Sequence, residues 1–551
     1  MSGFWLDLGV ILAYFVIIIG IGLSQRGKSA SLEGFALGGR EIAWWAVLAS
    51  ILASEISAGT FFGTPGQGYS LRNYTYAQLL LGYLLARVIV SAVFIPAFYR
   101  HNVVSIYEFL EIRFGPLTRR VASAVFLVTR ALASGTRLWV PTILLVLIWK
   151  LFVNRNVTPM NEFWLYAGAL TFITVLTAVY TTIGGIRAVI WTDVIQICIL
   201  FGALGFSFFF LLSRVPNGWA GVHEYLSRPE VATPETLTVF DWGHPSGGET
   251  GLWAWIKSVL EKEYTVWAAF LGSTFVTLAT HGTDQDMVQR MLTAKNKRES
   301  AKATILSGLV DLPIVFLVLS IGILLFVFYE LNPKEALILG PNGHLKSNEV
   351  FPQFILTEMP AGLRGLVIAG VLATTMGSLS TALNALATSY VRDFHFRWFG
   401  EPGTDEGRVR GLRLGTVMFA VILISIALGT AGMVALKPDL RILPIILGIF
   451  GYTYGSLLGI FLVGLFTRER GNCTGNMIAM LAGFLVVGLL SGLDQSLGLL
   501  VGHPDGFFVR KNLPVIEFPW RIMFGTLTTF GVAVLFRTLP GRRAAMDSQP
   551  A

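Results

Sequence analysis

The stretch Ala53-Ser54-Glu55-Ile56-Ser57-Ala58-Gly59-Thr60 interrupts an apolar segment in which a membrane-spanning helix would be expected to continue. A second interruption of the same kind is Leu278-Ala279-Thr280-His281-Gly282-Thr283-Asp284-Gln285. In hydrocarbon each unpaired backbone N–H or C=O costs several kcal/mol, so non-helical backbone survives only where protein, water or an ion satisfies it. One interruption in each half of the chain indicates a transport site that works by alternating access.

The composition around these breaks is that of a membrane protein. Of the 551 residues 54% are hydrophobic and 13% are charged, about half the charged fraction of soluble domains. The chain divides into about thirteen apolar blocks, each near the ~20 residues that cross a bilayer. They begin near Phe4, Ile42, Thr75, Val121, Phe163, Ala188, Val266, Ala303, Leu363, Leu414, Ile442, Thr474 and Pro519. We therefore expect an all-α polytopic membrane protein with about thirteen transmembrane helices.

The positions of lysine and arginine predict the orientation, because basic residues stay on the cytoplasmic side of short loops. We expect a multi-pass protein of the plasma (inner) membrane, with the N-terminus outside and the C-terminus cytoplasmic. The long loops at residues 214–254 and 332–360 then face outward. The net charge of +8 reflects this topology and contact with the lipid bilayer rather than with nucleic acid. The predicted inward basic residues are Arg26, Lys28, Arg40, Arg100, Arg113, Arg119, Arg120, Arg290, Lys295, Lys297, Arg298, Lys302, Arg392, Arg397, Arg408, Arg410, Arg413, Arg537, Arg542 and Arg543.

One literal motif match, Gly22-Leu23-Ser24-Gln25-Arg26-Gly27-Lys28-Ser29, fits the phosphate-binding loop of nucleotide hydrolases. That loop joins a buried strand to a helix whose N-terminal amides hold phosphate, whereas this stretch follows a membrane helix. We therefore expect no nucleotide partner. Uphill transport would then be driven by an ion gradient.

Hydroxyl and small residues recur on one face of the ninth block. The i, i+3, i+4, i+7 positions are Thr374, Gly377, Ser378 and Thr381. Hard cations prefer clustered oxygens. The Thr374 carbonyl and the Ser378 hydroxyl, set against open carbonyls of Ala53 and Ile56 in the first break, would complete a sodium site. The alternative is close helix packing, which small residues also permit.

Asp193 lies about six residues, or ~9 Å, beyond Arg187 in an apolar block. A carboxylate at that depth costs at least ~2.5 kcal/mol and normally faces a cavity or an ionic partner. It is predicted to couple an ion, or else to form a salt bridge with Arg130 or Arg137.

Four segments, in the same order along the chain, carry a resemblance to a known family. They are Ile56-Ser57-Ala58 through Gly66-Gln67-Gly68-Tyr69, Gly184-Gly185-Ile186-Arg187-Ala188-Val189-Ile190-Trp191-Thr192-Asp193, Thr283-Asp284-Gln285 with Val288-Gln289-Arg290, and Ser378 through Leu383-Asn384. In these segments the chain resembles the sodium/solute symporter family, which includes sodium-coupled sugar, proline, sialic acid and monocarboxylate transporters.

The resemblance implies one transport domain over residues 1–551 with a leucine-transporter-type core. Two five-helix inverted repeats would span residues 42–213 and 252–467, preceded by one helix (4–24) and followed by two (473–538). The resemblance places a general sodium site at Ala53, Ile56, Thr374, Gly377 and Ser378. A second site would use Asp193, Ser380 and Thr381. Similar family members commonly have serine at the position of Gly377, so one ligand is missing here.

The predicted substrate-binding set is mixed and polar. Arg137 could clamp a carboxylate in a bidentate pair, or instead serve as the ion partner of Asp193 or Glu55. Asp311 stands where similar sugar transporters use a basic residue, which argues against a simple hexose. The whole set is Glu55, Ser57, Thr60, Gln78, Arg137, Thr280 and His281.

The predicted function is sodium-coupled symport of a small polar organic solute, an organic acid or a sugar-like molecule, by alternating access. The coupling ion is Na⁺, with no organic cofactor. The nearest alternative is a proton-coupled symporter of the same fold that uses Glu55; an ion channel is a further one. An enzyme is not expected, because the sequence contains no zinc-protease motif, catalytic carboxylate pair or nucleophile–base set.

Overall fold

The computed structural model describes residues 2–25, 27, 29–138, 141–142, 144–146, 149, 159–245, 250–333, 350–436, 442–492 and 516–538. In these parts the chain forms helices and the segments that connect them, with two isolated β-bridges. Four of the predicted inward basic residues, Arg26, Lys28, Arg542 and Arg543, lie outside the described residues.

All thirteen predicted apolar blocks fall on helices. Within the described ranges seven helices are long and apolar enough to span a membrane, or eight if one bent pair counts as a span. The all-α polytopic prediction is confirmed. The helices are α1 (Ser2–Ser24), α3 (Trp44–Glu55) with α4 (Ala58–Leu71), α5 (Leu79–Ile89), α8 (Pro116–Arg137), α10 (Pro159–Arg214), α13 (Ser273–Gly282), α15 (Lys297–Leu331), α17 (Leu363–Tyr390), α19 (Asp405–Leu436), α20 (Ile442–Phe466), α21 (Cys473–Ser491) and α23 (Phe518–Val534).

Shorter elements extend or connect these helices. Three π-helical turns continue α5, precede α13 and follow α17; they are η4 (Val90–Phe94), η5 (Ala268–Gly272) and η7 (Val391–His395). The remaining elements are α2 (Leu32–Leu37), η2 (Gly38–Arg40), η3 (Thr75–Gln78), α6 (Ile95–Arg100), α7 (Tyr107–Phe114), α11 (Gly218–Leu226), α12 (Leu252–Glu261), α14 (Gln285–Met291), α16 (Val350–Thr357) and α18 (Phe396–Phe399).

Helix α10 contains two of the predicted blocks, which meet at a kink at Gly185 (φ 58°, ψ −155°). A β-carbon at this residue would lie 2.6 Å from the carbonyl oxygen of Phe35, so both the backbone angles and the close approach require glycine. Beside the kink, the Ser29 hydroxyl donates to the Gly184 carbonyl at 2.6 Å. Ser29, the last residue of the rejected phosphate-loop match, therefore holds a helix junction.

The first predicted break is present. Helices α3 and α4 meet at 63°, with Ile56 and Ser57 between them. The Ser57 side chain accepts from the Thr60 amide at 3.4 Å and so caps the N-terminus of α4. The Ser57 amide donates to the Glu55 carbonyl at 3.1 Å rather than to Ala53, the partner that a continuous helix would give it.

The second predicted break is also present, at Thr283 and Asp284 between α13 and α14. The Asp284 carboxylate accepts from the Asp286 amide at 2.9 Å and caps α14. The two broken helices touch one another, since α14 contacts α3. A polar side chain that starts a new helix therefore explains both interruptions.

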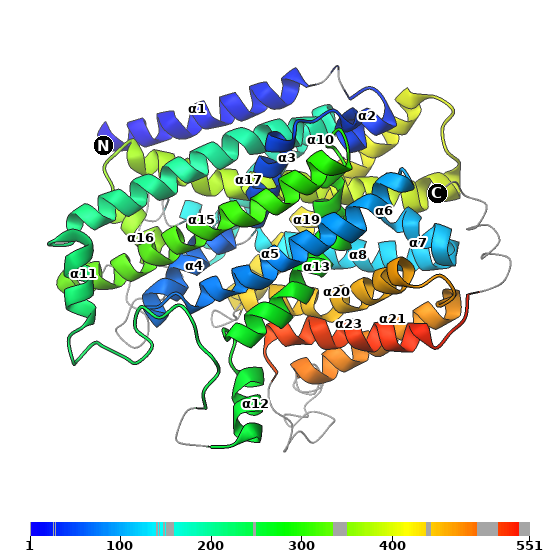
Figure 1. Ribbon diagram of the computed structural model, residues 1–551. Helices are drawn as coiled ribbons and strands as arrows, with labels where there is room; N and C mark the ends of the chain where they lie inside the picture. Colours follow the sequence, from blue (N-terminus) through cyan, green and yellow to red (C-terminus); the bar gives the residue numbers. More distant parts are fainter. Residues whose placement is uncertain are drawn as a thin grey trace.

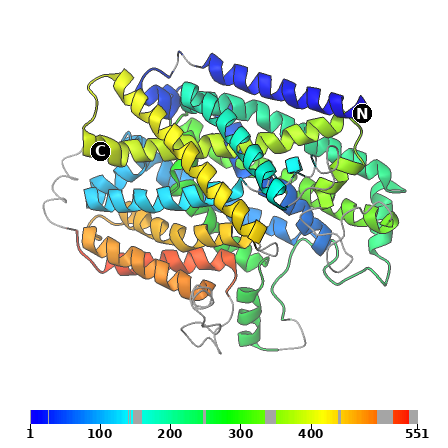
Figure 2. The ribbon, with the colours of Figure 1, turned by 180° about the vertical axis from the view of Figure 1, so that it is seen from behind.

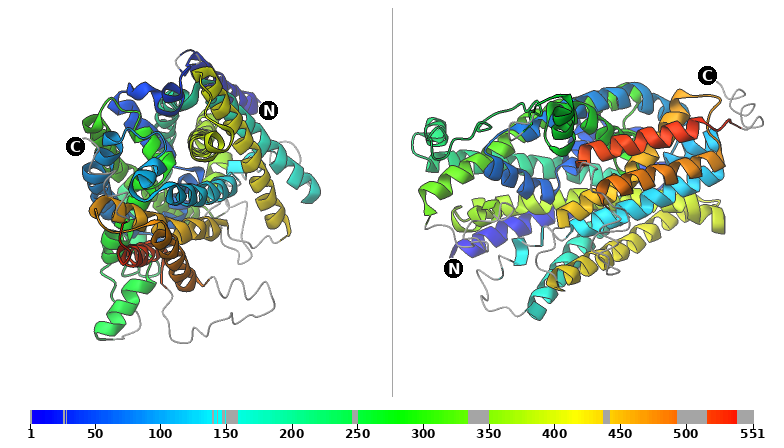
Figure 3. Two further views of the ribbon diagram at one scale, coloured as in Figure 1. Left: turned by 90° about the vertical axis from the view of Figure 1, so that its right-hand side faces the viewer. Right: turned by 90° about the horizontal axis from the view of Figure 1, so that it is seen from below.

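Helix α17 lies at the core of the bundle. Of its most apolar stretch 89% is buried, whereas the buried share of the corresponding stretch of α1 is 28%. Helix α17 packs against α10, α3, α8 and α14. Figure 1 shows α1 lying along one edge, and Figure 2 shows α19 crossing the face that is turned away from the viewer in Figure 1, where it contacts α10, α8 and α17. Helices α21 and α23 lie side by side on another flank (Figure 3). The hydroxyl-rich face of α17 is thus enclosed with both breaks.

Candidate functional site

Both breaks line a cavity of about 310 Å³ inside the bundle. The first break contributes Glu55 and Thr60, and the second contributes Thr280 and His281. A second cavity of about 240 Å³ shares Thr60 with it and continues past Ser57. The structure therefore brings these five predicted substrate residues to connected hollows.

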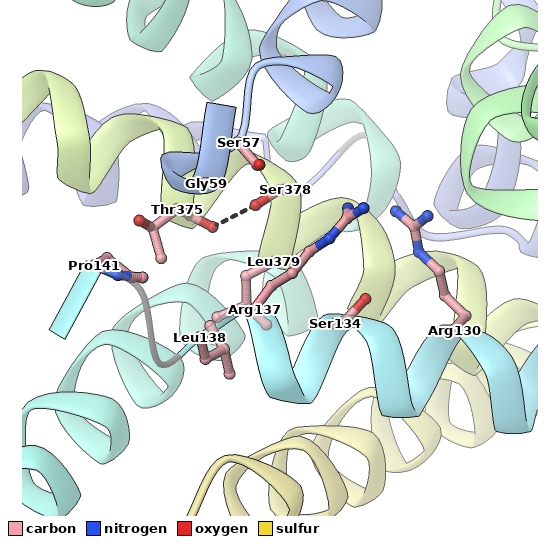
Figure 4. A pocket seen from close by; sticks show the side chains of 10 residues that line it. All are labelled: Ser57, Gly59, Arg130, Ser134, Arg137, Leu138, Pro141, Thr375, Ser378 and Leu379. Atoms are coloured by element: carbon pink, nitrogen blue, oxygen red, sulfur yellow. Dashed lines mark hydrogen bonds between the residues drawn. The ribbon is translucent and has the colours of Figure 1, made fainter. Parts of the chain in front are cut away.

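A third, smaller hollow joins the first break to α17 (Figure 4). Ser57 and Ser378 lie near each other on one side of it, and Arg130 and Arg137 extend from α8 on the other. Arg137 lines all three hollows.

Arg137 forms no ion pair among the described residues. Its guanidinium lies 4.8 Å from the centre of the Phe450 ring, a cation–π contact that leaves the N–H donors free. The ion partners suggested for it, Asp193 and Glu55, are instead bound to other arginines. The prediction of an internal salt bridge to Arg137 is therefore wrong.

Glu55 belongs to a buried charge cluster on one wall of the large cavity, which we call the Arg87 cluster: Glu55, Arg87, His281 and Asp311. Arg87 is 1% exposed and donates to Glu55 at 2.5 Å and to Asp311 at 2.7 Å. His281 Nε2 lies 2.6 Å from the same Glu55 oxygen. Two carboxylates thus share one arginine, and Glu55 also contacts an imidazole.

A second network connects α8, α14 and α10. Arg130 pairs with Asp284 at 3.1 Å and with Asp286. Arg290 pairs with Asp286 at 3.0 Å, and its Nη1 lies 3.9 Å from Asp193. The predicted salt bridge from Asp193 to Arg130 is therefore wrong, because Arg130 serves the second break. Arg290, predicted to be an inward loop residue, is fully buried.

The residues of the general sodium site converge in part. A β-carbon on Gly377 would lie 3.5 Å from the Ala53 carbonyl oxygen, so α17 faces the first break at this level. Ile56 is buried at the break, and Ser378 lines the small hollow beside it. The Thr374 hydroxyl donates to the Val371 carbonyl at 2.8 Å. Because the hydroxyl is used in this bond, the carbonyl oxygen of Thr374 is the atom that would coordinate an ion.

Ser380 and Thr381 of the second predicted sodium site lie on the same face of α17 as the general site, but their hydroxyls form hydrogen bonds within that helix. The Ser380 hydroxyl donates to the Gly377 carbonyl at 3.0 Å, and the Thr381 hydroxyl reaches the Gly377 and Ser378 carbonyls. Asp193 instead accepts from the Ser50 hydroxyl at 2.5 Å.

Gln78 is the one predicted substrate residue that does not line these hollows. Its amide donates to the Thr75 and Tyr264 carbonyls at 3.0 and 3.3 Å and accepts from the Asp241 amide at 3.1 Å. These hydrogen bonds connect Asp241 and Tyr264 to the residue that precedes α5. The Gln78 side chain is thus bonded to backbone groups and lines none of the three hollows.

Sequence reasoning missed Arg87 and Arg130 as cavity residues, although both lie in apolar blocks. An arginine within a predicted span normally faces a polar cavity or a carboxylate, and that signal would have found Arg87. The aromatic lining from Tyr76, Tyr83 and Tyr454 carries no comparable signal.

Ser378→Ala should raise the sodium concentration for half-maximal transport about tenfold, because it removes one of the oxygens at the meeting of α17 and the first break. Sodium titration of solute uptake in proteoliposomes measures this. Ser207→Ala, which removes a buried hydroxyl that bonds only the Ala203 carbonyl of its own helix, is the matched control. Equal sodium dependence in both variants would remove Ser378 from the ion site.

Comparisons with known proteins agree with this architecture. The model of the sodium:solute symporter family matches residues 35–483. The sodium/sialic acid symporter SiaT of Proteus mirabilis is 27% identical over 535 residues, which cover 97% of this chain and 95% of that protein. Sodium-coupled monocarboxylate transporter 1 of Homo sapiens is 28% identical, with 87% and 72% covered. The sodium/iodide cotransporter of Homo sapiens is 27% identical, with 93% and 72% covered.

Solved structures share the fold. A Na⁺-coupled sialic acid symporter in a substrate-bound outward-open state superposes with a TM-score of 0.75 at 22% identity, covering 96% of this chain and 97% of that one. A nucleobase-cation-symport-1 family transporter in a closed conformation gives a TM-score of 0.52 at 13% identity, covering 94% and 98%.

Proposed function

The chain belongs to the sodium:solute symporter family, and we propose that it couples sodium entry to the uptake of a small organic anion bearing a carboxylate. It is a polytopic membrane transporter with sodium as its coupling ion. On this proposal it is a transporter and not an enzyme, and it acts in the plasma (inner) membrane.

The observation that carries the anionic solute is the free guanidinium of Arg137. Three arginines line the large cavity, and two of them, Arg87 and Arg130, are neutralised by buried carboxylates. Among the described residues Arg137 forms no ion pair and lies over the Phe450 ring, so its charge is available to a ligand. A carboxylate matches the planar fork of a guanidinium in geometry as well as in charge.

The relatives support the same class of solute. Sialic acid, monocarboxylates and iodide are the solutes named for the relatives above, and all three are anions at neutral pH. A cavity of about 310 Å³ lies at the lower end of the range of small-molecule sites, and its tyrosines and phenylalanines suit the body of an organic acid.

We propose that the predicted repeats, residues 42–213 and 252–467, alternate access to this cavity, with the N-terminus outside. The first broken helix opens the first repeat, the second follows α12 near the start of the other, and the two contact each other. Helix α1 starts at the end of the bundle that holds α11 and runs to the opposite end, where α2 and α7 lie (Figure 1). Helix α11 belongs to a predicted outward loop, whereas α2 and α7 adjoin predicted inward arginines.

The proton-coupled alternative depended on Glu55 as a proton carrier. Glu55 is bound at 2.5 Å by Arg87 and approached at 2.6 Å by His281, and both partners favour the ionised carboxylate. This geometry supports a fixed structural charge rather than a proton that is loaded and released.

Uptake of a radiolabelled carboxylate into proteoliposomes tests the proposal. With a sodium gradient directed inward we expect saturable accumulation, and replacement of sodium by choline should abolish it. The solute is chosen by a thermal-shift screen of sialic acid, lactate, proline and galactose with and without sodium. Uptake that is equal in choline would refute sodium coupling, and stabilisation by galactose but by neither acid would refute the anionic solute.

The charge balance also makes the stoichiometry measurable. One sodium with a monovalent anion moves no net charge, so a membrane potential should not alter uptake. Two sodium ions would move one charge, and ~100 mV would then add ~2.3 kcal/mol. A potassium diffusion potential set with valinomycin distinguishes the two.

A further inference from the structure

Helix α12 exposes large apolar side chains that none of the described residues covers. Leu252 and Trp253, in its first turn, are 72% and 70% exposed. Phe240 and Trp242, in the segment that leads to α12, are 56% and 53% exposed. This segment and the helix are joined, because the indole N–H of Trp255 donates to the Trp242 carbonyl at 3.2 Å. Exposed apolar side chains that gather in one region indicate a contact surface.

One apolar stripe runs along α12, and the described residues cover it only at one end. Leu252, Ile256 and Val259 follow the i, i+4, i+7 spacing that places side chains on one face of a helix. Val259 is buried in a cluster with Trp520 of α23, whereas Leu252 is exposed. The face that packs on the bundle at the C-terminal end of α12 is therefore uncovered at the N-terminal end.

Two hydrogen bonds fix the C-terminal end of α12 beside the first turn of α23. The Trp520 indole N–H donates to the Val259 carbonyl at 3.2 Å, and the Glu517 amide donates to the Leu260 carbonyl at 3.0 Å. Glu517 directly precedes α23, and the sequence predicts that a span begins near Pro519. Helix α12 is therefore attached at the level where a span starts, which is the boundary between hydrocarbon and headgroups.

The direction of α12 differs from that of the spans. In Figure 1 α12 runs across the direction of α15 and α23 and projects away from the bundle. The left view of Figure 3 shows the same green helix extending past the edge of the bundle. A helix that is attached at the membrane boundary and crosses the spans lies along the surface of the bilayer rather than through it.

The apolar surface of α12 continues onto the outside of a predicted span. Trp255 packs edge-on against Trp267, with ring centres 5.7 Å apart. Trp267 and Phe270, at the start of the span predicted from Val266, are themselves exposed. Tryptophan is enriched at membrane interfaces, because its ring is apolar and its N–H stays near water. Lys257 is exposed on the same helix, and a lysine reaches headgroups while its stem stays in apolar surroundings.

We propose that α12 is an interfacial helix that inserts Leu252 and Trp253 into the bilayer at the boundary between headgroups and acyl chains. In the predicted orientation this boundary belongs to the outer leaflet. Glu263 and Tyr264, which follow α12, line the cavity of about 240 Å³. Lipid therefore holds the segment that forms one wall of this cavity. The proposal is independent of the ion and the solute that the protein carries.

Spin labelling at position 253 tests the depth of α12. Cys198 and Cys473 are replaced by serine, Trp253→Cys is labelled with a nitroxide, and the protein is reconstituted in phosphatidylcholine nanodiscs. Oxygen, which partitions into acyl chains, should relax this label more strongly than a water-soluble nickel chelate does. Glu230→Cys, at an exposed position after α11, is the control, and there the nickel chelate should be the stronger relaxant.

Two outcomes would overturn the proposal. If the nickel chelate relaxes the label of Trp253→Cys as strongly as that of Glu230→Cys, α12 lies in water. If neither reagent reaches the label, protein covers this face, and dipolar broadening between labels in liposomes would identify a second copy as the cover. Leu252→Cys repeats the measurement and should give the same order of the two reagents as Trp253→Cys. A melting midpoint equal to that of the serine background shows that each labelled variant is folded.

Discussion

Replacing Arg137 by glutamine should raise the half-saturating concentration of a carboxylate solute about thirtyfold or more. Truncating one member of a buried charged pair costs ~2–5 kcal/mol, and each ~1.4 kcal/mol is a factor of ten in affinity. Among the described residues Arg137 is the cavity arginine that forms no ion pair, so its loss disturbs none of the ion pairs seen there. Uptake in proteoliposomes under a fixed inward sodium gradient measures the change.

Two further variants isolate the role of the guanidinium. Arg137→Lys keeps the charge but loses the bidentate fork and should fall between the wild type and Arg137→Gln. Arg228→Gln is the matched control, because Arg228 also lies over an aromatic ring, 4.7 Å from the centre of Tyr225, but lines none of the cavities. Sodium binding without solute should be unchanged in Arg137→Gln. An unaltered half-saturating concentration for the carboxylate would place the solute elsewhere.

The breaks could be predicted because their cause is local. A run of small and polar residues inside an apolar segment cannot continue a helix in hydrocarbon without partners, and Ser57 and Asp284 are both residues that cap a new helix. The family and the all-helical fold predicted from these breaks and the other motifs are confirmed. The assignments of individual sodium and substrate residues remain predictions.

The pairing of buried charges could not be predicted in the same way. Arg87, Arg130, Arg137 and Arg290 come from three separate helices, and nothing in their spacing says which carboxylate each will meet. Basic residues near Arg290 made it look like part of a cytoplasmic loop, whereas α14 buries it against α3. Gln78 was similarly ambiguous, because a polar residue at the start of a span serves a loop or a cavity equally well.

The same pairing explains why charges of both signs are tolerated at the centre of the bundle. In the Arg87 cluster one guanidinium contacts both carboxylates, and His281 Nε2 lies 2.6 Å from Glu55. In the second network Asp193, Asp284 and Asp286 each lie within 4 Å of Arg130 or Arg290. Each of these buried carboxylates therefore faces a guanidinium.

Arg87→Met should be among the most destabilising single substitutions in the chain. It leaves Glu55 and Asp311 buried without their arginine, and removing one member of a buried ion pair costs ~3–5 kcal/mol. Thermal melting of the purified protein in detergent, without solute, should show a large fall in the midpoint. Arg187→Met, which breaks a 3.3 Å pair with the exposed Glu41, should cost ~0–1 kcal/mol and serves as the control.

A second substitution separates lost charge balance from lost packing. Arg87→Met with Asp311→Asn removes one positive and one negative charge and leaves Glu55 paired with His281, so the double variant should melt well above Arg87→Met alone. If the double variant melts no higher than the single one, the packing of the long Arg87 side chain against α15 stabilises the bundle and its charge does not. Asp311→Asn does not restore the packing of the lost Arg87 side chain. A higher melting temperature in the double variant would therefore identify the uncompensated carboxylates as the cause of the destabilisation.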